Sequence, residues 1–135
     1  MASILLADDQ PREIRVAAEY LVSQGHTVWV AAGGSEAIAL VYNGHPDVAV
    51  VDLMMPRTDG LQVLDAIRAR YPASETRVVV ITLIGATGEP MRNWDPEQMA
   101  VHGFVLAPYR SWDIILAVEQ QLYRKVEWGF ERPLP

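Results

Sequence analysis

Val48-Ala49-Val50-Val51-Asp52-Leu53-Met54-Met55-Pro56 is the stretch that decides the fold. It opens with four apolar residues, three of them valines. This composition is typical of a strand that is buried on both faces of a parallel sheet. The apolar run stops at the carboxylate of Asp52. Because open α/β sheets bind ligands beyond the carboxyl ends of their strands, this acid is the first candidate for a functional residue.

The composition indicates a single acidic domain. The chain has 135 residues, half of them hydrophobic, and a formal net charge of −6. Lys and Arg residues form no cluster, so a nucleic-acid surface is disfavoured, because DNA and RNA binding depends on neutralising phosphates. There is no cysteine, which excludes disulfides, thiolate metal sites and thiol catalysis.

The N-terminal residues do not resemble a signal peptide, because the apolar run Ile4-Leu5-Leu6 is followed almost at once by Asp8 and Asp9. No segment approaches the length of a membrane span. We therefore expect a cytoplasmic protein that does not contact a membrane.

Strand-like and helix-like segments alternate along the chain. The expected strands are 3–7, 27–31, 48–52, 77–82 and 103–106. The expected helices lie between Pro11 and Gly25, Gly33 and Gly44, Leu61 and Pro72, Pro96 and Val101, and Ser111 and Val126. Ser111 is the expected N-cap of the last helix. Five strands that alternate with five helices imply a parallel sheet with right-handed crossovers and helices on both faces.

Three of these strands end in polar side chains that should meet at one edge of the sheet, namely Asp8 with Asp9, Asp52, and Thr82. Neighbouring acids repel unless a cation lies among them, and oxygen ligands suit a hard divalent cation, most naturally Mg²⁺. A metal beside Asp52 could hold an incoming phosphoryl group while this carboxylate acts as nucleophile. The alternative is an acid cluster that only caps helices and faces water. Three acids at converging strand ends, with a hydroxyl beside them, favour the metal site.

These motifs together resemble the receiver domain of two-component response regulators over residues 3–126. The resemblance rests on Asp8 and Asp9, on Asp52 within Asp-Leu-Met-Met-Pro-Arg-Thr-Asp-Gly, on Thr82, and on Phe104 with Pro108 around the fifth strand. It implies an α/β fold of the flavodoxin-like, doubly wound (βα)5 type, with a five-stranded parallel sheet in the strand order 2-1-3-4-5. Residues 1–126 would form the receiver domain and residues 127–135 a C-terminal tail.

The resemblance also implies roles for the acids. In that family the acid matching Asp52 is the phosphoacceptor, which takes a phosphoryl group from a histidine kinase. The acids matching Asp8 and Asp9 hold Mg²⁺ together with Asp52, and the backbone carbonyl of Met54 is a further ligand. Mn²⁺ is the alternative ion.

The implied function is a switch in phosphorelay signal transduction rather than an enzyme. In the family, the hydroxyl matching Thr82 moves toward the phosphate, and the aromatic ring matching Phe104 turns inward with it. The expected partners are a histidine kinase or phosphotransfer protein and a downstream protein, and a homodimer is left open. The sequence shows no output domain that binds DNA, so no direct DNA binding is expected.

Three features depart from the family pattern. The lysine that normally precedes the proline after the fifth strand is replaced by Ala107. Leu83, after the switch hydroxyl, is bulky where the family has a small residue, and the loop 83–98 is longer than usual. These departures favour an alternative function, a degenerate receiver that acts as a phosphorylation-independent protein-interaction module. The complete set of acids favours the phospho-accepting switch.

Overall fold

The computed structural model describes residues 1–55, 60–82, 97 and 100–128, the last five of these by their backbone only. Five parallel strands form one sheet in the order β2-β1-β3-β4-β5. The strands are β1 (Ser3–Ala7), β2 (Thr27–Ala31), β3 (Val48–Asp52), β4 (Arg77–Thr82) and β5 (Gly103–Leu106). All five strands lie where the sequence predicts them, and the predicted strand order is confirmed.

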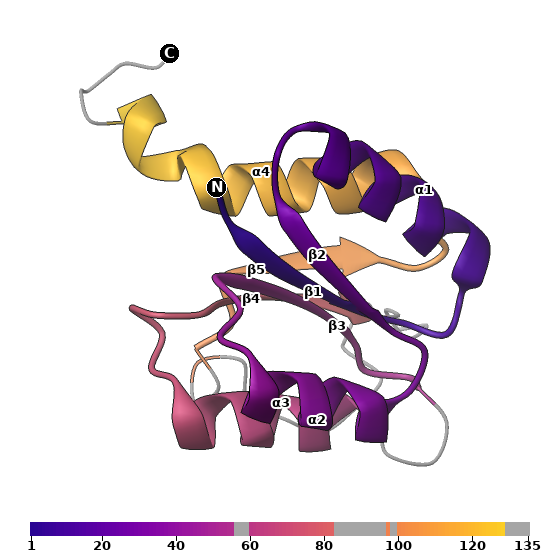
Figure 1. The fold of residues 1–135 in the computed structure, drawn as a ribbon, viewed down its shortest axis with the longest axis vertical. Helices are drawn as coiled ribbons and strands as arrows, with labels where there is room; N and C mark the ends of the chain where they lie inside the picture. The colour runs from indigo at the N-terminus through magenta and orange to yellow at the C-terminus, as the bar shows by residue number, and fades with distance from the viewer. Residues whose placement is uncertain (56–59, 83–96, 98–99, 129–135) are drawn as a thin grey trace, which may run out of the picture.

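Helices cover both faces of this sheet. The described helices are α1 (Pro11–Ser23), α2 (Gly34–Asn43), α3 (Gly60–Arg70) and α4 (Ser111–Trp128). Figure 1 shows α1 and α4 on one face and α2 and α3 on the other, so the sheet is doubly wound, as predicted. Most of the predicted helix at 96–101 lies outside the described residues.

The central strand β3 is buried on both faces, as its valine-rich sequence predicts. Val48 and Val50 belong to the apolar core beneath α1 and α4, whereas Ala49 and Val51 belong to the core on the side of α2 and α3. All four side chains are at most 1% exposed. Because both cores pack on this strand, the backbone that carries Asp52 is held from two sides.

The N-terminus of α4 corrects one prediction. Ser111 is the first residue of the helix and not its N-cap, so the cap position falls on Arg110. The backbone N–H of Arg110 donates to the carboxylate of Asp113 (2.8 Å), and the N–H of Ser111 donates to the carboxylate of Glu13 on α1 (2.5 Å). Because two carboxylates satisfy these first donors, the helix begins without a capping hydroxyl.

Within the part of the chain that the structure describes, none of the helices combines the length and the apolar character that a bilayer-crossing segment requires.

Candidate functional site

The predicted polar side chains lie at the carboxyl edge of the sheet. Asp8 follows β1 directly, Asp52 is the last residue of β3, and Thr82 is the last residue of β4. One carboxylate oxygen from each of Asp8, Asp9 and Asp52 lies within 4.8 Å of the others. The structure therefore confirms that Asp52 and the adjacent acids Asp8 and Asp9, which lie far from Asp52 in the sequence, form one cluster.

The three acids differ in burial. The side chains of Asp8 and Asp52 are 2% and 8% exposed, whereas Asp9 is exposed to solvent. A buried pair of carboxylates with a third at the surface leaves a path by which a hydrated cation can reach the cluster.

Backbone hydrogen bonds orient the two buried carboxylates. Asp8 Oδ1 accepts from the N–H of Gln10 (3.1 Å), and Asp52 Oδ1 accepts from the N–H of Met54 (2.8 Å). Both bonds join a carboxylate to the amide two residues further on, so each acid stabilises the turn that leaves its own strand.

Electrostatics explains why this cluster favours a cation. The pKa of Asp8 is raised from 3.8 to about 7, chiefly by burial and also by a hydrogen bond and charge repulsion from Asp52, while the hydrogen bonds from Tyr109 and from the N–H of Gln10 act to lower it. In the absence of metal, the cluster therefore retains a proton on Asp8 up to about neutral pH. Three oxygen ligands that repel one another in this way fit Mg²⁺, which binds through carboxylates and retained waters.

Gly60, the first residue of α3, lies directly against the backbone of Asp52 and Leu53. A Cβ atom at Gly60 would lie 2.4 Å from the carbonyl oxygen of Asp52 and 2.6 Å from the Cα atom of Leu53. Both contacts are with backbone atoms, which cannot rotate away. The Asp-Gly pair at positions 59 and 60 thus ends in a glycine because α3 begins in contact with the site.

Thr82 and the fifth strand form the other side of the site. Thr82 is 2% exposed and lines a cavity of about 370 Å³ with Asp52 and Ala107. The N–H of Ala107 donates to the carbonyl of Thr82 (2.9 Å), which extends the pairing of β4 with β5 by one residue. Ala107 therefore lies beside Thr82, at the position where the resemblance implies a lysine, and presents only a methyl group.

Phe104, the expected aromatic switch residue, lies on β5 with its side chain 49% exposed. The inward position that the resemblance implies for the phosphorylated state is thus not the position in this structure. Leu83 and nearly all of the loop 83–98 lie outside the described residues, so the predictions made for them stay predictions.

Tyr109 is a site residue that the sequence analysis missed. Its hydroxyl donates a hydrogen bond to Asp8 Oδ2, and its ring is half-buried. Burial, the hydrogen bond with Asp8 and the negative charges of Asp8, Asp52 and Asp9 raise the pKa of Tyr109 above its ordinary value, so the hydroxyl stays protonated. The sequence feature that could have indicated this role is the position of the tyrosine hydroxyl, two residues after Ala107.

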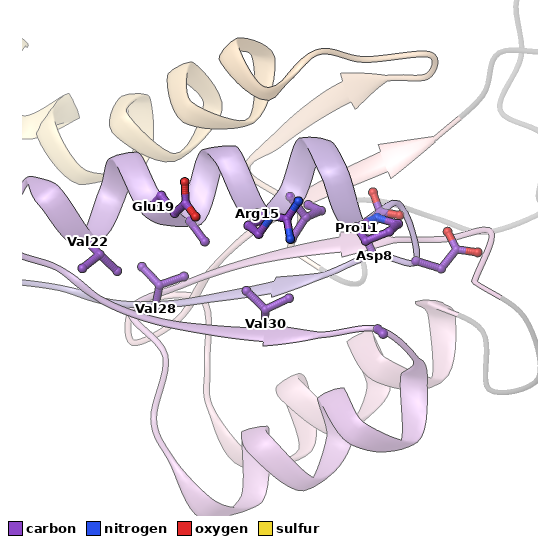
Figure 2. Close-up of a pocket in the computed structure, with 11 residues that line it drawn as sticks. Asp8, Pro11, Arg15, Glu19, Val22, Val28 and Val30 are labelled. Carbon is purple, nitrogen blue, oxygen red and sulfur yellow. The ribbon is translucent and has the colours of Figure 1, made fainter.

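A second cavity, larger than the one beside Asp52, lies between α1 and β2. It has a volume of about 620 Å³, and Figure 2 shows Val22, Val28 and Val30 along it, with Arg15 and Glu19 on the helix above. Asp8 lines one end of this cavity, which therefore adjoins the acid cluster on the side of α1. The lining is mainly aliphatic, and it adds no ligand to the cluster beyond Asp8 and Asp9 among the described residues.

Comparison with known proteins identifies the family. Residues 4–119 match the response regulator receiver domain. The transcriptional regulatory protein ResD of Bacillus subtilis is 30% identical over 127 residues, which make up 94% of this chain and 50% of ResD. The chain spans about half the length of the curated relatives it matches.

Solved structures agree with this match. The N-terminal domain of a response regulator/sensory box/GGDEF three-domain protein from Carboxydothermus hydrogenoformans is 27% identical, with a TM-score of 0.71 over 94% of this chain and 98% of that one. The response regulator TrrA from Thermotoga maritima, solved in complex with Mg²⁺ and BeF, is 23% identical, with a TM-score of 0.67 over 90% of this chain and 99% of that one. The second likeness supports the fold.

Proposed function

Because the chain belongs to the response regulator receiver family of two-component signalling, we propose that Asp52 accepts a phosphoryl group from a histidine kinase or a phosphotransfer protein. Mg²⁺, or Mn²⁺ in its place, would be held by Asp8, Asp9, Asp52 and the backbone carbonyl of Met54. The observation that carries this proposal is the cluster of three carboxylates within 4.8 Å at the carboxyl edge of the sheet.

The transfer is a displacement at phosphorus. A carboxylate oxygen of Asp52 forms a bond to phosphorus, and the bond from phosphorus to the donor's imidazole nitrogen breaks. The imidazole leaves with the electron pair of that bond, and the product is an acyl phosphate on Asp52. When bound, the cation supplies charge neutralisation for the phosphoryl oxygens.

The protein's own residues prepare this step. The N–H of Met54 holds Asp52 Oδ1 in place (2.8 Å), and the cavity of about 370 Å³ beside Asp52 has room for a phosphoryl group. Thr82 lines the same cavity and supplies a hydroxyl on the side of β4. Positioning of this kind, together with charge stabilisation, accounts for most of the catalysis of phosphoryl transfer.

The output would be a protein contact and not a second chemical reaction, so the domain would act as a switch and not as an enzyme. A net charge of −6 disfavours direct DNA binding by this domain. The curated relatives include longer transcriptional regulators, in which other parts of the chain are available for that role. Cytoplasmic placement and the division into a receiver (1–126) and a tail (127–135) are part of the same proposal.

A second candidate function is a phosphorylation-independent interaction module. The observation behind it is Ala107, which offers the phosphoryl group neither a charge nor a donor side chain. The complete acid cluster and the family match weigh against this candidate, because carboxylates that repel one another are costly to keep without a cation.

Detection of an acyl phosphate tests the proposal. The protein is incubated with acetyl phosphate and Mg²⁺, and intact mass and ³¹P spectra are recorded for the natural protein and for Asp52→Asn. The expected result is one added phosphoryl group on the natural protein, absent from Asp52→Asn and from samples with excess chelator. An unmodified natural protein under conditions that label a control receiver would overturn the proposal.

A further inference from the structure

Tyr109 lies on the side of the site where the resemblance implies a lysine and this chain has Ala107. The described residues that line the cavity beside Asp52 are Asp9, Gln10, Asp52, Met54, Ile81, Thr82, Ala107, Pro108 and Tyr109. None of these described residues is a lysine or an arginine. Three of the described lining residues, Ala107, Pro108 and Tyr109, come from the segment that follows β5. Of these three, Tyr109 alone has a side chain that can donate a hydrogen bond.

We infer that Tyr109 takes over the role of the missing lysine as the hydrogen-bond donor on this side of the site. Its hydroxyl binds Asp8 in the metal-free protein and binds a phosphoryl oxygen once Asp52 carries the phosphoryl group. The second contact rests on the proposed function, whereas the first is present in the structure.

The contact with Asp8 shows that the hydroxyl reaches the acids. The hydrogen bond joins residues 101 positions apart in the sequence and links the segment after β5 to the end of β1. The ring is half-buried and packs against the core beneath α1 and α4, which fixes the direction of the hydroxyl. Asp52 is close enough for its charge to act on the hydroxyl of Tyr109.

A tyrosine differs from a lysine in two ways that matter here. Its hydroxyl is neutral at physiological pH, so it does not repel a divalent cation as an ammonium would. It also has a single proton to donate, whereas an ammonium has three. The contacts of Tyr109 with Asp8 and with the phosphoryl group therefore exclude each other, and phosphorylation must release Asp8 from the hydroxyl.

Two substitutions separate this role from a purely structural one. Tyr109→Phe removes the hydroxyl oxygen and keeps the ring, and Ala107→Lys restores the family's ammonium. Tyr123→Phe, on an exposed position of α4, is the matched control. Affinity for beryllofluoride, a phosphoryl mimic, is measured by amide chemical shifts in saturating Mg²⁺ for each single variant and for Tyr109→Phe combined with Ala107→Lys. Mg²⁺ affinity without beryllofluoride is measured separately.

We expect Tyr109→Phe to weaken beryllofluoride binding by about threefold to tenfold, the loss of one neutral hydrogen bond, while Tyr123→Phe changes nothing. In the Ala107→Lys background, Tyr109→Phe should have no effect, because the ammonium supplies the donor. Ala107→Lys alone should weaken Mg²⁺ binding, by about tenfold, through charge repulsion.

Equal beryllofluoride affinity in the natural protein and Tyr109→Phe would overturn the inference while leaving the proposed function intact. A loss in Tyr109→Phe that Ala107→Lys does not rescue would also overturn it, since that result indicates a packing role for the ring. If neither the natural protein nor Ala107→Lys binds beryllofluoride in Mg²⁺, the proposed function itself fails, and the phosphoryl contact of Tyr109 fails with it.

Discussion

The site has two halves that rest on different parts of the sheet. The acidic half consists of Asp8, Asp9 and Asp52 at the ends of β1 and β3, and the response half consists of Thr82, Phe104 and Ala107 on or beside β4 and β5. The acidic half has every acid that the resemblance implies, whereas the response half has Ala107 where the resemblance implies a lysine.

Burial explains part of this difference. The core residues of β1 and β3 are at most 1% exposed, whereas β5 is an edge strand on which Phe104 and Leu106 are 49% and 55% exposed. A change in a central strand disturbs two packed faces, but a change at an edge strand disturbs few contacts. The acidic half is therefore fixed by the core, whereas the part of the response half on β5 can change without loss of the fold.

The largest expected effect concerns Gly60, which supports the acidic half. Gly60→Ala places a Cβ atom 2.4 Å from the carbonyl oxygen of Asp52, so backbone must move. We expect a loss of about 3 kcal/mol in the free energy of unfolding, measured by urea melts. Gly33→Ala is the control, because a Cβ atom there meets nothing within 4 Å. Equal, small losses in both variants would show that the acidic half is not held as tightly as its packing indicates.

The next effect concerns metal binding. Asp52→Asn and Asp9→Ala should each weaken Mg²⁺ binding at least about tenfold in calorimetry, because each removes a charged oxygen ligand. Asp65→Asn, an exposed acid on α3, is the control with equal loss of charge. If all three variants bind Mg²⁺ as the natural protein does, the cation binds elsewhere and the acidic half has another role.

A smaller effect concerns the pH dependence of stability without metal. The pKa of Asp8 is about 7 in the folded protein and about 3.8 ordinarily, so the folded state binds its proton more tightly. The stability of the metal-free protein should therefore fall as pH rises from about 4 to about 7 and then level off. Asp8→Asn should remove this fall and be the more stable of the two proteins at about pH 8. Urea melts in excess chelator measure it, and parallel curves for the two proteins would contradict the account.

The smallest effect belongs to the response half. Leu106→Thr on the exposed edge strand should change the free energy of unfolding by no more than about 0.5 kcal/mol. Ile81→Ala, which empties a buried position on the adjacent β4, should cost about 2–5 kcal/mol in the same melts. A large loss from Leu106→Thr would mean that the edge strand is constrained as strongly as the centre of the sheet.

The fold and the acidic half could be predicted because both arise from local sequence patterns. A valine-rich run that ends in an acid, as at Asp52, indicates both a buried strand and the position of its carboxyl end. Parallel pairing then brings the carboxyl ends of the strands, and the acids that follow them, into one cluster. The contact of Tyr109 with Asp8 could not be predicted, because it depends on how a segment 101 residues away crosses the site. The start of α4 differs from the prediction for a similar reason, because Glu13 on α1, which is distant in the sequence, accepts the hydrogen bond from the N–H of Ser111.

A complete acidic half joined to a weakened response half should bind a phosphoryl mimic but transmit little of its effect to β5. Amide chemical shifts of the natural protein and Ala107→Lys, with Mg²⁺ and beryllofluoride added, measure this transmission. We expect saturable shifts at Gln10 and Met54 in both proteins, with clearly smaller shifts at Phe104 in the natural protein than in Ala107→Lys. No shift at Met54, or an equally large response of Phe104 in both proteins, would contradict it.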